Sequence, residues 1–341
     1  MTLHGPHPTL YKWLAVLLLI VFCLLSSSLA ARMLNGFDLS DSLIDASQIH
    51  HGGPRKDGIP AIDKPKFEDA DQVEWLQPDS RVLGVVHNGI AKAYPIAILN
   101  WHEVVNDLFA DEAVVITYCP LCGSGVVYRS EVAGRRLTFG VSGLLYNSDL
   151  LLYDRQTDSL WSQLHHQAIS GEMKALRLMP LPSSHTSWAA WQQQYPDTKV
   201  LTRSTGYIRS YNRSPYRGYE ESPRLFFNVE FMSRAYHPKE RVLGVELDGM
   251  FKAFPFSELA KLGVSGEFED ILGDKILHIE YNAELRDGRV WLLPGDELNA
   301  VNLFWFAWYA FHPDTEVFKV KIDTPVKASI DTPVQALGNQ N

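Results

Sequence analysis

Two cysteines in the middle of the chain carry its clearest chemical signal. Cys119 and Cys122 belong to the run Cys119-Pro120-Leu121-Cys122-Gly123, which directly follows the apolar run 113–118. Two thiolates separated by two residues can bind one metal ion, because a tight turn points both sulfurs to the same side. Thiolate donors favour copper or zinc over ions that prefer oxygen ligands. The pair therefore predicts a soft-metal site.

The residues after the pair help to separate a metal site from a redox dithiol. CPLCG after an aromatic residue resembles one knuckle of rubredoxins and zinc ribbons. A thioredoxin-type CxxC lies at the start of a helix, whereas Gly-Ser-Gly and two valines follow Cys122 and predict a hairpin. This favours metal over dithiol chemistry. A reversible dithiol and a local structural disulfide remain open as alternatives.

A single knuckle supplies only two ligands, so the site needs other donors. His102 is the nearest candidate in sequence and lies on the stretch that leads into the cysteine strand. We therefore predict Cys119, Cys122 and His102 as metal ligands. A satisfied, half-buried histidine is the alternative interpretation of His102. His87, at a turn, and His50 and His51, further upstream, are the remaining candidates.

A polar stretch between residues 135 and 163 holds the candidate catalytic groups. Asp149 and Asp154 stand in the clusters Tyr146–Asp149 and Asp154–Thr157, and either carboxylate could act as a base or orient a ligand. The alternative is two Asx-type turns between strands. The chain contains no nucleophile elbow, phosphate-binding loop, HExxH pair or dinucleotide fingerprint, so the sequence predicts no nucleotide or flavin cofactor.

An internal repeat indicates how the chain is organised. RVLGVVHNGIAKAYP at 81–95 is matched by RVLGVELDGMFKAFP at 241–255, Tyr118 by Tyr281, and the tryptophan-rich run from Trp188 by the run from Trp305. Three matches in the same order predict a duplicated module. The first copy spans 81–201 with an insertion at 129–187, and the second spans 241–320. Cys119 and Cys122 align with Asn282 and Leu285, so only one copy holds the thiols.

The repeat also predicts the fold class. Each copy contains alternating strands around an Asn-Gly or Asp-Gly turn, a further buried strand and one closing helix. We expect an α+β protein with a mainly antiparallel or mixed β-sheet, built as two tandem copies of one strand-rich module. Residues 32–80 are expected to form a loop-rich strap, 202–240 a connector, and 321–341 an extended tail.

The first 31 residues indicate a location outside the cytoplasm. They contain the apolar run from Trp13 to Leu25, followed by Ser28-Leu29-Ala30. This pattern is typical of a cleaved signal peptide. If the flanking residues are included, the apolar segment is long enough to span a bilayer as an uncleaved membrane anchor. Both interpretations predict an extracytoplasmic protein, periplasmic or in the cell envelope, and the second adds the membrane as a partner. Cleavage would remove Cys23 and leave Cys119 and Cys122 as the only cysteines.

Composition excludes two classes of protein. The 341 residues include 40 acidic and 31 basic side chains, and the resulting net charge of −9 disfavours binding to nucleic acids. The hydrophobic fraction of 46% and the charged fraction of 21% indicate folded domains and not a disordered chain.

Three motifs give the chain a family resemblance. These are IHHGGPRKDGIPAID, TYCPLCGSGVVY and FGVSGLLYNSDLLLYDRQTDSLWSQ. Together they resemble the bacterial domain-of-unknown-function family 3179. The resemblance implies an exported or membrane-associated bacterial protein and implies no activity. Three functions stay open: a metal-binding protein or metalloenzyme, a thiol–disulfide redox protein, and a non-catalytic ligand-binding or scaffold protein.

Overall fold

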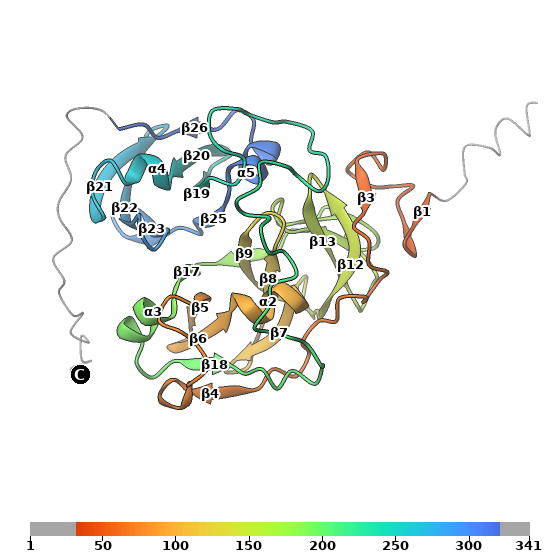
Figure 1. Ribbon diagram of the computed structural model, residues 1–341. Coiled ribbons are helices and arrows are strands. Elements are labelled where there is room, and N and C mark those ends of the chain that lie inside the picture. The colour runs from red at the N-terminus through yellow and green to blue at the C-terminus, as the bar shows by residue number, and fades with distance from the viewer. Residues whose placement is uncertain (1–31, 321–341) are drawn as a thin grey trace, which may run out of the picture.

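The computed structural model of the protein describes residues 32–320 (Figure 1). The predictions for 1–31 and 321–341 lie outside these residues. Strands dominate, and the α-helices are short: α2 (Ile96–His102), α3 (Trp188–Gln194), α4 (Phe256–Leu259) and α5 (Trp305–Phe311). The prediction of a strand-rich protein with mainly antiparallel or mixed sheets is confirmed. Within 32–320, the apolar helices all fall short of the length that would cross a bilayer.

A mixed sheet begins the first half of the chain. Strand β5 (Arg81–His87) pairs with β6 (Ile90–Pro95) through a turn in which Asn88 and Gly89 both have positive φ, as the sequence predicts. The sheet has the order β17-β5-β6-β18-β4. Its other strands are β17 (Ser184–Ser187), β18 (Lys199–Leu201) and β4 (Phe67–Asp69). Only the pairing of β18 with β6 is parallel.

The cysteines lie in an antiparallel sheet with the order β16-β9-β8-β7. Its strands are β7 (Val104–Phe109), β8 (Glu112–Cys119), β9 (Ser124–Arg129) and β16 (Met179–Leu181). Cys119 ends β8 and pairs with Ser124, the first residue of β9. The hairpin predicted after the cysteines is therefore present.

A third sheet holds most of the predicted insertion. It contains β12 (Phe139–Tyr146), β13 (Asp149–Asp154), β14 (Leu160–Ser162) and β15 (Gln167–Ser170), with β3 (Ile49–His51) at its edge. The strap at 32–80 thus contributes strands to this sheet and to the first one. The range 129–187 also contains β16 and β17, which pair with β9 and β5 of the first half.

The second half repeats this order of pairing. Strands β25 (Val301–Phe304), β19 (Arg241–Leu247), β20 (Met250–Pro255) and β26 (Glu316–Val317) form a sheet in which only the last pairing is parallel. An antiparallel sheet accompanies it, with β21 (Ser265–Leu272), β22 (Lys275–Asn282), β23 (Asp287–Leu292) and β24 (Asp296–Glu297). The short elements β1 (Met33–Leu34), β2 (Phe37–Asp38), β10 (Glu131–Val132), β11 (Arg135–Arg136) and a 3-10 turn (Ala70–Gln72) complete the described chain.

In each half, a contact between a glycine and a tryptophan packs the closing helix against its sheet. A Cβ added at Gly84 would overlap the Trp191 ring, and one added at Gly244 would overlap the Trp308 ring. Both tryptophans are buried. Glycine in β5 and β19 therefore lets the closing helix lie directly on its sheet.

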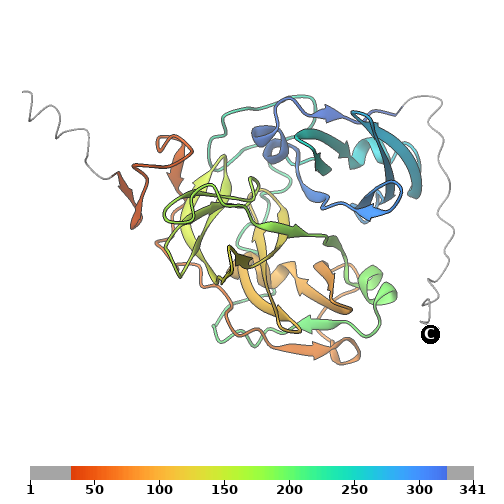
Figure 2. The same cartoon turned by 180° about the vertical axis from the view of Figure 1, so that it is seen from behind.

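The second half also packs against the cysteine turn. The Phe304 amide donates a hydrogen bond to the Cys122 carbonyl oxygen at 2.8 Å, and Arg241 Nη1 donates to the Gly123 carbonyl oxygen at 2.7 Å. Gly123 has a φ of 63°, and a Cβ there would lie 2.9 Å from Arg241 Nη1. Figure 2 shows the second half in blue above the sheets of the first half. The turn is thus enclosed by both halves.

Candidate functional site

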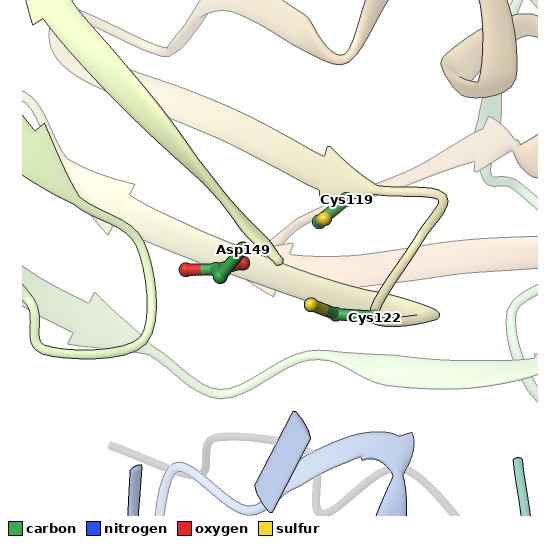
Figure 3. A group of neighbouring side chains, drawn as sticks. All are labelled: Cys119, Cys122 and Asp149. Atoms are coloured by element: carbon green, nitrogen blue, oxygen red, sulfur yellow. The ribbon is translucent and has the colours of Figure 1, made fainter. Parts of the chain in front are cut away.

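The two thiols lie at the end of one hairpin and are shielded from solvent. Cys119 is 1% exposed and Cys122 is fully buried. Both are free cysteines. Figure 3 shows the two side chains on opposite sides of the turn between β8 and β9, with both sulfurs directed toward Asp149.

Asp149 reaches the thiols from the start of β13. The preceding turn residues Asn147 and Ser148 have φ of 50° and 63°, which reverses the chain directly beside the cysteines. The Ser148 carbonyl oxygen lies 3.4 Å from Cys122 Sγ and 3.8 Å from Cys119 Sγ. One donor atom from each of Cys119, Cys122 and Asp149 lies within 4.8 Å of the other two. These residues thus form a candidate metal-binding group.

The Asp149 carboxylate is only partly satisfied by the protein. Its Oδ2 accepts a hydrogen bond from the Leu164 amide at 3.1 Å. Its Oδ1 is buried and has no hydrogen-bond partner. Because a buried, unpartnered carboxylate oxygen is costly, this atom calls for a ligand or a proton.

The electrostatics of the group favour a cation. Burial raises the pKa of both thiols, and it raises the pKa of Asp149 to about 7. Glu103 is also buried, and burial raises its pKa to about 8. The neighbouring charges that act on Cys119 and Glu103 are negative and raise their pKa values further. The charges of these acidic groups therefore oppose one another's ionisation.

The sequence analysis missed Glu103. This residue ends α2 with a φ of 59°, and its backbone oxygen accepts a hydrogen bond from the Tyr118 amide at 2.8 Å. Tyr216 donates a long hydrogen bond of 3.5 Å to its Oε1. A lone glutamate carries no motif, and the only available signal was its position beside His102.

His102 is not brought to the sulfurs. Its Nδ1 lies 2.7 Å from the Pro60 carbonyl oxygen, and its Nε2 lies 2.7 Å from the Tyr211 hydroxyl. Both ring nitrogens are therefore engaged, and burial lowers the pKa of the ring. His102 ties together two irregular segments, which agrees with the alternative of a satisfied buried histidine.

The other histidine candidates also have local partners. His87 Nε2 lies 2.8 Å from Glu112, at the far end of β8 from the cysteines. His51 Nδ1 accepts a hydrogen bond from the Gly53 amide at 3.0 Å. His50 lies in β3 and pairs with Leu145. None of these three belongs to the group formed by the described residues Cys119, Cys122 and Asp149.

Asp154 has a structural role. Its Oδ1 accepts a hydrogen bond from the Thr157 amide at 2.7 Å, and its Oδ2 accepts one from Trp161 Nε1 at 2.9 Å. These bonds close the turn after β13, as the Asx-turn interpretation predicts. Of the two candidate carboxylates, only Asp149 lies beside the thiols.

A family model covers most of the chain, including this group. The model for Protein of unknown function (DUF3179) matches residues 56–290. The chain belongs to this family. The family resemblance of the sequence motifs is thus confirmed. No curated protein and no solved structure matches the chain significantly.

Residues 32–320 of this DUF3179 chain contain one further group of possible ligands. Glu267, His278 and Glu280 face one another across β21 and β22 on the second half. His278 Nε2 lies 3.6 Å from Glu267 and 3.7 Å from Glu280. All three are at least partly exposed to solvent, so water can hydrate them and their arrangement does not require an ion. The buried thiol group is the stronger candidate.

Proposed function

We propose that this DUF3179 protein binds a transition-metal ion, copper or zinc, through Cys119, Cys122 and Asp149. The observation that carries the proposal is the buried Asp149 Oδ1, which has no hydrogen-bond partner and lies beside two free thiols. Asp149 replaces His102 as the third donor, because both His102 nitrogens have other partners.

The charge of the group supports a bound cation. A metal ion displaces protons from thiols and carboxyls and lowers their pKa values. Burial has the opposite effect on all the acidic groups here, so their ionisation without a metal ion is less favourable than in water. A divalent ion would balance the two thiolates and leave the carboxylate to complete the coordination.

The donor set favours zinc over copper. Two thiolates suit both ions, whereas a carboxylate is a common zinc ligand and a poor one for Cu(I). Three protein ligands leave the fourth position of a tetrahedral ion free for water or substrate, as in catalytic zinc sites. A metalloenzyme is therefore the more specific form of the proposal.

Metal analysis of the purified protein tests the proposal. Protein prepared without chelator should hold close to one equivalent of zinc or copper, and Cys119→Ser and Asp149→Ala should lose it. Asn282→Ser is the matched control, because Asn282 aligns with Cys119 in the second half. The same metal content in all four proteins, or none in any after reconstitution, contradicts the proposal.

Two features of the site weigh against a thiol–disulfide function. Exchange requires an accessible thiolate, whereas burial shields both thiols and raises their pKa values. A free Cys119–Cys122 pair that becomes a disulfide with a reduction potential above about −300 mV would support this second function.

We also propose that the two halves are tandem copies and that the protein acts outside the cytoplasm. The matching sheet orders and the matching glycine–tryptophan contacts support the duplication. The apolar run at 13–25 supports export or anchoring. Cell fractionation and N-terminal sequencing of the mature protein test the location.

A further inference from the structure

The connector between the two halves lies across the candidate metal site. Residues 202–240 run from the end of β18 to the start of β19 without a helix or strand (Figure 1). Irregular segments of this length are uncommon in compact proteins and often act as lids. Its contacts show what it covers.

The connector binds residues that stand next to the ligands. Ser148 Oγ donates a hydrogen bond to the Phe227 carbonyl oxygen at 2.8 Å, and the Glu230 amide donates to Asn147 Oδ1 at 2.8 Å. Asn147 and Ser148 form the turn that positions Asp149. The connector is thus attached directly to one wall of the site.

Three tyrosines of the connector point inward. Tyr211 bonds to His102, Tyr216 bonds to Glu103, and Tyr219 is 3% exposed and belongs to the same core as both cysteines. The Tyr219 hydroxyl is buried without a hydrogen-bond partner of normal geometry. Burial and then the charges of Cys122 and Cys119 raise the pKa of this hydroxyl.

The connector is held without a strand ladder. Its backbone-to-backbone hydrogen bonds to the rest of the described chain are confined to its two ends, at Thr202 and at residues 238–240. Gly206 and Gly218 have positive φ and no atom near their missing side chains. Segments with few backbone ladder bonds open at lower free energy than the sheets that they cover.

We infer that residues 202–240 form a removable cover that controls the entry and exit of the ion at Cys119, Cys122 and Asp149. This inference rests on the proposed function for the identity of the ion, but the cover itself can be tested without metal. Because both thiols are buried and the connector is attached to one wall of their site, their reaction with a reagent reports on the opening of that wall.

Thiol labelling of the full, reduced, metal-free chain measures this opening. A small maleimide is added, and labelling of Cys119 and Cys122 is followed by peptide mass spectrometry, which separates them from Cys23. The double variant Tyr211→Phe/Tyr216→Phe removes two hydroxyls that hold the cover. We expect labelling about tenfold faster or more, since each lost hydrogen bond changes the opening equilibrium several-fold.

Tyr195→Phe is the matched control, because Tyr195 packs on Trp191 at the end of α3 and, within residues 32–320, makes no hydrogen bond to the connector. Ser148→Ala provides a second test should the double variant fail to fold. The cover is refuted if the variants label at the wild-type rate. It is also refuted if labelling requires global unfolding, shown by labelling and unfolding rates that rise equally with urea.

Metal exchange separates the cover from the proposed function. With zinc bound, removal by a chelator should accelerate in the variants by the same factor as labelling. Faster labelling in a protein that binds neither zinc nor copper would overturn the proposed function alone. If the protein binds zinc but the variants exchange metal and label at the wild-type rates, only the proposal of a cover is overturned.

Discussion

Two turns at equivalent places in the molecule differ in their chemistry. Cys119–Gly123 joins β8 to β9, and residues 282–286 join β22 to β23 in a sheet of the same antiparallel order. Each turn receives an arginine from the other half. Arg241 donates to the Gly123 carbonyl oxygen, and Arg81 donates to the Leu285 carbonyl oxygen. The backbone setting is therefore shared.

The second turn closes without sulfur. Asn282 Oδ1 accepts a hydrogen bond from the Leu285 amide at 2.9 Å, and Leu285 lines a cavity of about 1060 Å³ between the halves. In the position equivalent to Glu103, facing Tyr281, the second half has Gly266. Since this hairpin forms without thiols and without an acid at the position of Glu103, Cys119, Cys122 and Glu103 are not needed to build it. This difference supports the proposed role of these three residues in metal binding.

The largest expected effect is on stabilisation by zinc. At a free zinc concentration about 1,000 times the dissociation constant, the wild-type protein should gain about 4 kcal/mol in its free energy of unfolding. Cys119→Ser should gain almost nothing at that concentration, because a soft ion loses a thiolate ligand. Asn282→Ser should gain as much as the wild type. Denaturant titration with and without zinc measures the gain. Equal gains in both variants would contradict the predicted difference between the two turns.

The next effect tests whether the scaffold is equivalent in both halves. Gly84→Ala and Gly244→Ala each place a Cβ within the ring of the facing tryptophan, Trp191 or Trp308. Overpacking of a buried contact costs about 1–3 kcal/mol, and an overlap with a rigid indole lies at the upper end. Both variants should lower the free energy of unfolding by about 3 kcal/mol. If Gly84→Ala lowers the free energy of unfolding and Gly244→Ala does not, the two contacts are not equivalent.

The pH dependence of the free energy of unfolding tests the protonation of the buried Glu103 side chain. Burial raises the pKa of Glu103 to about 8, above its unfolded value near 4.5, so the folded state holds the proton more tightly. The contribution of Glu103 to the free energy of unfolding is fully present below pH 4.5 and is lost as the pH rises toward 8. Between pH 6.5 and 8, the metal-free wild type should lose about 1–2 kcal/mol more than Glu103→Gln.

The buried histidines do not contribute to this difference. His165 and His166, whose pKa values burial lowers to about 4, are neutral in the folded chain above pH 6.5, and their titration in the unfolded chain is the same in both proteins. Asp149, with its pKa of about 7, titrates in both proteins, and its charge effect on Glu103 is part of the measured difference. Urea unfolding of both proteins at several pH values gives the two curves. Parallel curves would mean that Glu103 is already ionised in the fold.

Local patterns in the sequence predicted the hairpins well. Asn88-Gly89 and the run after Cys122 gave correct turns, because such turns depend on the φ angles of neighbouring residues. The closing helix at Trp188 was also predicted. The boundaries of the insertion were not resolved, because β16 and β17 are short strands whose partners lie far away in sequence.

The site was predicted only in part. CPLCG identified the thiols, and Asp149 was one of two candidate carboxylates, but proximity in sequence favoured His102 over Asp149 as a ligand. The connection between β12 and β13 brings Asp149 to the turn, and this long-range contact has no local signature. Glu103 and the tyrosines of the connector were missed for the same reason.

The smallest expected effect compares the hydrogen bonds of the two closing helices. Trp191 Nε1 donates to Thr198 Oγ1 at 2.9 Å, and Trp308 Nε1 donates to Thr315 Oγ1 at 2.8 Å. Thr198 is fully buried, whereas Thr315 is partly exposed. Thr198→Val leaves a buried indole N–H without a partner and should cost about 1–2 kcal/mol. Thr315→Val should cost less than about 1 kcal/mol, because water can replace the lost hydroxyl. Urea unfolding of the two variants measures both costs, and a larger loss for Thr315→Val would show that burial does not set the difference between the halves.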